Sequence, residues 1–321
     1  MSVVSADGPI VGVDLGGTKI LARLVDPATG RAIGRQKSPT PSDGPESVVA
    51  AILDLVTTLD AAGEAVAVGI GVPGFVVDRS IVVRCANIEG WDDPVDVGAL
   101  VSAALDKPVI VGNDVDCGAV AEHRLGAGEG IDDLLAVFVG TGVGGGLILD
   151  GSLVQGTRGM VGEIGHVTVV PGGRPCGCGG FGHLEAYAGR AGMERRAREL
   201  AAAGRPSQLV SLAGPSPIKS RHLSRALDEG DEVANELLDE AVEALAQVIG
   251  NAITLLDLQR VVLGGGVVDK LGQPLLDRIS GSSHFGGLAG DICELRLARR
   301  LDDAGVVGAA LLAADQLARP G

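Results

Sequence analysis

The chain has 321 residues, which is long enough for two domains of ordinary size. Its net charge of −15 opposes binding to nucleic acid or to an anionic membrane surface, because both require a cationic footprint. Aromatic residues make up only 2%, so we expect any ligand to be held mainly by hydrogen bonds.

The cysteines and the first residues indicate a reducing compartment. Five cysteines are an odd number, and the pair in CGC is spaced for a shared metal rather than for a disulfide framework. The first residues lack a basic segment followed by a long apolar one, and no stretch approaches the apolar length that spans a bilayer. We therefore expect a cytoplasmic protein that associates with no membrane.

The N-terminal part predicts a meander of three strands followed by a helix. From residue 9 to residue 40, short runs of Val, Ile and Leu are separated by a Gly-Gly pair and by the turn sequence PATG. Residues 45–62 carry apolar side chains at helical spacing and predict a helix. Residues 65–77 predict a buried strand that runs into a Pro-Gly turn.

A polar pair marks the next junction between strand and helix. Residues 96–105 predict a helix, 108–112 a short strand and 114–125 a second helix, and the pair Asn113-Asp114 lies where that helix begins. Such a junction is a common place for chemistry. Residues 134–156 then repeat the opening pattern of apolar run, Gly-rich turn and apolar run, which is weak evidence for two related lobes.

The remainder is mainly helical. Residues 185–203, 223–227 and 232–256 predict helices, and the last of these has a wide apolar face. The segment 204–220 is rich in Pro, Ser and Gly and predicts a loop or insertion.

The C-terminal part predicts one more strand and a closing helix. Residues 260–272 predict a strand followed by a third glycine cluster, and a loop rich in Gly and Ser follows at 280–290. The apolar run 305–318 predicts a helix that must pack against another part of the chain.

Three glycine turns favour a nucleotide as ligand, because glycine lets backbone N–H groups approach phosphate oxygens. The pattern G-x-G-x-x-G occurs in the second turn, but a strand pattern follows it, which argues against a dinucleotide fold, and no P-loop signature occurs. Asp14 precedes the first turn and could hold Mg²⁺. Each turn alone also fits a tight hairpin. The nucleotide candidates are Gly16, Gly17, Thr18 and Lys19, then Thr141 and Gly142, and then Gly264, Gly265 and Gly266.

Four potential metal ligands lie within residues 159–188: His166, Cys176, Cys178 and His183. Two nitrogen and two sulfur ligands suit tetrahedral Zn²⁺. Because such a set leaves no open position, we expect the metal to shape the loop rather than act as a Lewis acid.

Seven motifs resemble, in this order, the ROK family of sugar kinases and sugar-responsive repressors, and most closely its bacterial glucokinase-like kinases. The resemblance runs from about Ile10 to Ala314 and is most specific in GEIGH and CGCG. It implies the two-lobed, actin-like α/β ATPase fold of the hexokinase superfamily. Residues 1–115 with 300–321 would form the smaller lobe, and 116–299 the larger lobe with the zinc loop. The motifs are VGVDLGGTK, GVPG, GND, GTGVGGG, GEIGH, CGCGGFGHLE and LGGG.

The resemblance also implies ATP-dependent, Mg²⁺-assisted phosphorylation of the 6-hydroxyl of a hexose, with glucose as the first candidate. It assigns the catalytic base to Asp114 and a sugar contact to Asn113, whereas the residues alone fit a helix N-cap. It assigns further sugar contacts to Glu163, His166 and Glu185, because a carboxylate accepts two hydroxyl hydrogen bonds. Solvated surface charge is the alternative for the two acids. Gly74 and Asn87 are weaker candidates for additional sugar contacts.

One metal ligand departs from the pattern that the resemblance implies. Family members usually have Cys where this chain has His183, so the alternative is an incomplete site in which His183 faces the sugar or solvent. His166 is a candidate for both roles, with one ring nitrogen on zinc and the other toward a sugar hydroxyl. Cys85, Cys117 and Cys293 are expected to be buried apolar residues.

Several functions remain in competition. A ROK repressor would carry a helix-turn-helix module before the first strand, and here nine residues precede Ile10. An inactive sugar sensor would be expected to have lost Asp14, Asp114 or the glycine turns, and all are present. Another hexose or an N-acetylated amino sugar could be the substrate, and polyphosphate could be the donor. The resemblance implies a homodimer or homotetramer, and the sequence itself does not choose between them.

Overall fold

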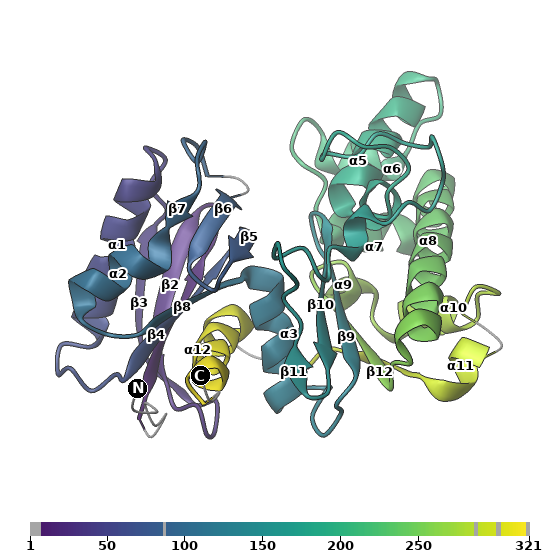
Figure 1. The fold of residues 1–321 in the computed structure, drawn as a ribbon. Coiled ribbons are helices and arrows are strands. Elements are labelled where there is room, and N and C mark those ends of the chain that lie inside the picture. Colours follow the sequence, from purple (N-terminus) through teal and green to yellow (C-terminus); the bar gives the residue numbers. More distant parts are fainter. Residues whose placement is uncertain (1–7, 86–87, 286–287, 300–302, 319–321) are drawn as a thin grey trace. The chain divides into compact units, whose positions relative to one another are not determined.

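The computed structural model describes residues 8–85, 88–285, 288–299 and 303–318. The chain divides into two compact units, both drawn in Figure 1. Unit 1 comprises Met1–Gly130, Leu153–Val161 and Arg300–Gly321, and unit 2 comprises Ile131–Ser152 and Gly162–Arg299. The sequence-based division assigned 116–130 and 153–161 to the second lobe instead. Most of 116–130 is a helix that packs on the closing helix of unit 1, which explains its place there.

A five-stranded mixed sheet forms the centre of unit 1. Its first three strands form the predicted antiparallel meander, and the last two continue the sheet in parallel. The order is β3-β2-β1-β4-β8. The strands are β1 (Ile10–Leu15), β2 (Lys19–Val25), β3 (Ala32–Pro39), β4 (Ala67–Val72) and β8 (Val109–Asn113).

Helices and a small sheet complete this unit. Helix α1 begins at a proline in its first turn and buries one apolar stripe, as its spacing predicted. The three-stranded sheet has the order β5-β6-β7. The remaining elements are α1 (Pro45–Leu59), β5 (Gly74–Val77), β6 (Ile81–Cys85), β7 (Val95–Asp96), α2 (Val97–Leu105), α3 (Asp114–Leu125) and α12 (Ala304–Leu317).

Helix α12 packs on β1, β4 and α3, where Figure 1 draws it in yellow against the sheet. All its residues from Val306 to Ala314 are buried, so the predicted closing helix packs against other parts of the chain, as expected. Glycines permit the contact. A Cβ on Gly12 would lie 2.1 Å from the carbonyl oxygen of Val306, and one on Gly308 would lie 1.8 Å from that of Cys117. The backbones therefore approach to a distance that no other residue allows.

Unit 2 contains a second five-stranded sheet with the order β11-β10-β9-β12-β13. As in unit 1, an antiparallel hairpin is followed by two parallel strands, which agrees with the sequence repeat. The strands are β9 (Leu134–Val139), β10 (Val143–Leu149), β11 (Ser152–Leu153), β12 (Arg260–Gly264) and β13 (Glu294–Leu297).

Helix α8, the longest described helix, packs against several other helices of unit 2 and has the predicted bounds (Figure 1). None of the described helices is both long and apolar enough to cross a membrane. The helical elements of unit 2 are η1 (Ile164–His166), α4 (Glu185–Ala188), α5 (Arg190–Ala202), α6 (Gln208–Ala213), α7 (Ser220–Asp228), α8 (Glu232–Leu256), α9 (Val268–Leu271), α10 (Gln273–Ser280) and α11 (Leu288–Ile292).

Two expectations for this region were wrong. The predicted helix 185–203 is broken at Gly189, whose backbone is extended, because the next residue donates its N–H to the carbonyl of Gly140 instead of continuing the helix. The predicted loop 204–220 contains α6. That short helix is capped by Ser207, whose hydroxyl donates in turn to Asp231 at the start of α8.

Replacing Gly69 by Ala should destabilise the protein by about 3 kcal/mol, because overpacking a rigid backbone contact is costly. A Cβ there would lie 2.0 Å from the carbonyl oxygen of Ala309 in α12. Chemical denaturation measures the change. In the same strand, a Cβ on Gly71 would meet the Cys117 sulfur at 3.2 Å, so Gly71→Ala should cost less than about 1.5 kcal/mol. Equal costs would contradict the backbone explanation.

Candidate functional site

The pair Asn113-Asp114 joins β8 to α3 in unit 1. Asn113 is the N-cap of α3, and its side-chain oxygen accepts from the N–H of Val115 at 2.8 Å and of Asp116 at 3.2 Å. Its amide group donates to the carbonyl of Gly74 at 3.0 Å. Asp114 is the first residue of the helix and accepts from Val115 N–H at 2.9 Å. The capping role thus belongs to Asn113, and it fixes the start of the helix that carries Asp114.

The local structure explains why position 74 is a glycine. A Cβ at this position would lie 2.0 Å from the carbonyl oxygen of Arg84 in the neighbouring strand. Its own carbonyl holds Asn113, so two predicted sugar contacts are bonded to each other. The candidate Asn87 lies outside the described residues.

The three isolated cysteines are buried, as expected. Burial raises the pKa of the Cys85 thiol to about 12, and the charge of Asp114 adds to the shift. Burial likewise raises the pKa of Cys117 well above its usual value and that of Cys293 to about 11. All three are neutral thiols at pH 7, so none is prepared to act as a nucleophile.

The first glycine turn connects β1 to β2, and Gly16 N–H donates to the carbonyl of Lys19 at 2.9 Å. Asp14 lies at the end of β1, against Gly305 in the first turn of α12, where a Cβ would come within 3.0 Å of its carboxyl group. Burial raises the pKa of Asp14; Lys19 lowers it and Asp303 raises it. A half-buried carboxylate beside an exposed Gly-Thr-Lys turn suits a hydrated cation.

The second glycine turn connects β9 to β10, so a strand follows it and the exclusion of a dinucleotide fold is confirmed. The carbonyl of Gly140 accepts from Arg190 N–H at 3.1 Å, and that of Thr141 from Ala191 N–H at 3.0 Å. The start of α5 therefore fixes this turn. In the third cluster, Gly265 has φ +91°, a conformation that favours glycine.

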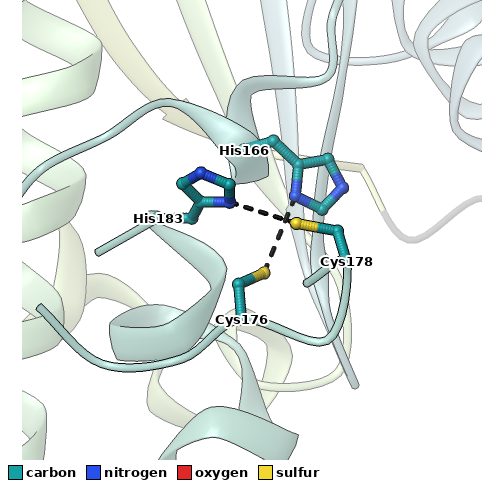
Figure 2. A group of neighbouring side chains, drawn as sticks. All are labelled: His166, Cys176, Cys178 and His183. Atoms are coloured by element: carbon teal, nitrogen blue, oxygen red, sulfur yellow. Dashed lines mark hydrogen bonds between the residues drawn. The ribbon is translucent and has the colours of Figure 1, made fainter. Parts of the chain in front are cut away.

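The four predicted metal ligands converge in one loop of unit 2, and Figure 2 shows their side chains turned toward one another. Their ligand atoms all lie within 4.8 Å of each other. The Cys178 sulfur is 3.2 Å from His183 Nδ1, and the Cys176 sulfur is 3.8 Å from His166 Nδ1. Tetrahedral zinc separates sulfur and nitrogen ligands by roughly 3.3–3.8 Å. This donor set fits zinc, and His183 belongs to it rather than facing away.

Contacts outside the cluster also hold this loop. Arg174 forms an ion pair of 2.7 Å with Glu240 of α8 and lies over the ring of Tyr187 at 4.7 Å from its centre. The Tyr187 hydroxyl accepts from Arg174 N–H at 3.1 Å. None of these three residues was predicted from the sequence, because their partners are distant along the chain. They tie the loop to α4 and α8.

The predicted sugar-binding side chains Glu163, His166 and Glu185 lie together in unit 2. His166 Nε2 is 3.7 Å from a Glu163 oxygen, and both side chains are less than one-third exposed, at 29% and 27%. Burial raises the pKa of Glu163, His166 lowers it, and Glu185 raises it. Glu163 lies beside the imidazole, and Glu185 is near enough to Glu163 to raise its pKa. The three side chains form one acceptor group.

Glu185 connects the metal loop to the second glycine turn. One of its oxygens accepts from Val143 N–H at 3.1 Å, and a Cβ on Gly142 would lie 2.1 Å from that oxygen. The other oxygen accepts from the Cys176 thiol at 3.7 Å. Burial raises the pKa of that thiol to about 11, so without a metal it keeps its proton at pH 7. A single carboxylate therefore contacts both predicted sites.

Comparison with known proteins identifies the family. The model of the ROK family matches residues 10–316, so the chain belongs to the ROK family. It is 36% identical to a glucokinase of Streptomyces coelicolor, over 95% of this chain and 98% of that one. It is 33% identical to an N-acetylmannosamine kinase of Shigella flexneri, over 95% and 98%.

The fold agrees with this assignment. A ROK family glucokinase from Streptomyces griseus, solved in complex with glucose and AMPPNP, superimposes with a TM-score of 0.78 at 36% identity, covering 96% of this chain and all of that one. The predicted fold class, a two-lobed α/β fold of the ROK and hexokinase type, is confirmed.

The purified protein should contain stoichiometric zinc that His183→Ala largely removes, because loss of one ligand opens a four-ligand site. His183→Cys should keep the metal, since thiolate also binds zinc. Metal analysis by mass spectrometry measures both. His284→Ala serves as the control, because His284 lies outside the cluster and pairs with Glu243. Full zinc in His183→Ala would contradict the four-ligand site.

Replacing Asp14 by Asn should stabilise the protein at neutral pH. Because burial raises the folded-state pKa, ionisation of Asp14 costs stability above that pKa, and the cost disappears as the carboxyl group is protonated at lower pH. The gain in unfolding free energy should therefore shrink as the pH falls from neutral toward about 4, the ordinary pKa range of an aspartate. Asp26 has a lowered pKa owing to its bond with Thr29, so Asp26→Asn should show the opposite sign.

Proposed function

We propose that this ROK family protein is an ATP-dependent kinase that phosphorylates the 6-hydroxyl of a hexose, with glucose as the first candidate. The observation that carries the proposal is the position of Glu185. Its carboxylate touches the second glycine turn and lies in the acceptor group with Glu163 and His166. Hydroxyl acceptors and a turn suited to phosphate thus occur side by side within unit 2.

Phosphoryl transfer needs a positioned hydroxyl, a base and neutralised phosphates. Asp114 accepts the proton of the sugar 6-hydroxyl. The hydroxyl oxygen attacks the terminal phosphorus of ATP, and ADP leaves. Asn113 and Gly74 hold the start of α3 and contact the sugar, as does Asn87. Glu163, His166 and Glu185 bind further hydroxyls.

The donor is assigned to the three glycine turns. Their backbone N–H groups, with Thr18, Lys19 and Thr141, contact the phosphates, and Asp14 holds Mg²⁺ directly or through water. When bound beside Asp14, Mg²⁺ would supply positive charge that offsets the charge of the phosphates. The further members are Gly16, Gly17, Gly142, Gly264, Gly265 and Gly266.

Zinc has a structural role in this proposal. His166, Cys176, Cys178 and His183 supply four ligands, which leave no position for substrate. Nδ1 of His166 lies beside the Cys176 sulfur, while Nε2 is directed to Glu163. A metal on Nδ1 would hold the ring so that Nε2 serves the sugar side.

The chain's relatives support a second candidate substrate. The similarity to an N-acetylmannosamine kinase favours N-acetylated amino sugars as the alternative, with other hexoses behind them. A non-catalytic sensor is disfavoured, because Asp14 and Asp114 are both present and positioned by local structure. Polyphosphate remains an alternative donor. A cytoplasmic homodimer or homotetramer completes the proposal.

Replacing Asp114 by Asn should lower kcat by about 10²–10⁴-fold, the usual contribution of a general base. An ADP-release assay with glucose, mannose, fructose, allose and N-acetylmannosamine measures the rate and identifies the sugar. Asp106→Asn is the matched control, because Asp106 is exposed and its left-handed backbone, with φ 52°, also suits Asn. Full activity of the Asp114 variant would remove Asp114 from the mechanism, and no turnover of any sugar would reject the kinase.

A further inference from the structure

Arg190 is anchored beside the second glycine turn. It is the first residue of α5 and is half-buried. One end of its guanidinium donates to the Thr141 hydroxyl at 2.6 Å, and the other donates to the carbonyl of Ile218. Two anchoring bonds hold this long side chain in one place, which reduces the entropy that a further contact would cost.

The charge of Arg190 has no carboxylate partner among the described residues. On the same helix, Arg196 pairs with Glu199 at 3.5 Å and Arg198 pairs with Glu194 at 2.9 Å. Glu194 is four residues after Arg190, but it is bound to Arg198 and to Ile218 N–H. A fixed, uncompensated cation on a protein of net charge −15 favours an anionic ligand.

Donor groups remain open at the same place. A guanidinium has five N–H groups, and two of them are used here. The other three have no acceptor within the described part of the chain, and Nε, the nitrogen without either bond, is not among the buried unpaired atoms of that part. The Thr141 hydroxyl accepts from Arg190, which leaves its own proton to donate elsewhere. The bond from Arg190 thus orients the Thr141 hydroxyl so that both side chains can donate to one anionic ligand.

The two flanks of this turn carry opposite charge. The Glu185 carboxylate accepts from Val143 N–H, so its negative charge lies on the Val143 side of the turn and that N–H group is not open to phosphate. The Arg190 guanidinium lies at Thr141, where it would attract phosphate. The anion subsite is therefore on the Thr141 side, and the hydroxyl acceptor is on the Val143 side.

The anchor of Arg190 also connects this turn to the third glycine cluster. Ile218 lies two residues before Ser220, the first residue of α7. Ser220 lies near Gly266, because a Cβ on Gly266 would be 3.6 Å from the Ser220 hydroxyl. Two predicted donor-binding segments are thus linked through the partner of Arg190.

We propose that Arg190, together with the Thr141 hydroxyl that it orients, binds a phosphate group of the phosphoryl donor. The inference rests on the proposed kinase function and adds a cationic phosphate ligand to the donor site. It predicts that Arg190 recognises phosphate and makes no contribution to the affinity for the nucleoside.

Calorimetry with ADP and with adenosine tests this. Arg190→Gln should weaken ADP binding by about tenfold or more, because a charged hydrogen bond is lost, and should change adenosine affinity by less than about twofold. Arg190→Lys should retain part of the ADP affinity, since lysine keeps the positive charge but lacks the planar, bidentate donors of the guanidinium. In the ADP-release assay, the KM for ATP should rise while the KM for sugar stays constant.

Controls separate binding from folding. Arg225→Gln removes the same charge at an exposed position of α7 that pairs with Glu229, and it should leave both affinities unchanged. If Arg190→Gln unfolds in thermal melts, Arg190→Lys carries the comparison. A double variant with Thr141→Val should lose less ADP affinity than the sum of the single losses, because the two side chains act together.

Several outcomes would overturn the inference. Unchanged ADP affinity in Arg190→Gln, or equal losses for ADP and adenosine, would reject a phosphate contact. A wild-type protein that binds neither ADP nor tripolyphosphate would also reject it. Failure of the kinase proposal is separate: a wild-type protein that binds ADP through Arg190 but phosphorylates no sugar would contradict the proposed function and leave the phosphate contact intact.

Discussion

Close contact between backbones, which only glycine permits, determines the geometry of both units. In unit 1, α12 lies on β1 and β4 because Gly12, Gly69 and Gly308 present no side chain at the crossing. In unit 2, Gly162 approaches the carbonyl of Gly145 and Gly165 approaches that of Val143 in the same way. A chain with 51 glycines and few aromatic residues thus obtains precision from backbone proximity rather than from large side chains.

Sequence patterns predicted elements whose cause is local. Helices α3 and α8 have their expected bounds, because a cap or an apolar stripe lies within each segment. The break at Gly189 and the short helix α6 were missed, since each depends on a bond to a residue far along the chain, Gly140 in one case and Asp231 in the other. Arg190 was missed for the same reason. Local spacing was also enough to collect the metal ligands, which occupy one short segment.

Within each unit, the candidate residues are held by groups that constrain one another. The side-chain oxygen of Asn113 caps α3 and its amide group donates to the carbonyl of Gly74. The start of the helix is therefore fixed before any ligand binds. His166 divides its ring between the Cys176 sulfur and Glu163. The ion pair of Arg174 with Glu240 and the hydrogen bond from Arg174 N–H to the Tyr187 hydroxyl hold the metal loop from outside the cluster. Preorganisation of this kind reduces the entropy cost of binding a flexible, polar ligand.

The contact between Gly142 and Glu185 has a consequence for protein engineering. Any side chain at position 142 would occupy the space of the Glu185 carboxylate, whose oxygen lies 2.1 Å from the would-be Cβ. Diversity introduced into this turn to change donor preference would therefore displace an acid on the acceptor side. A library that varies position 142 would alter two specificities at once. Position 141 is the better place to vary one of them alone, because its side chain faces Arg190 and solvent.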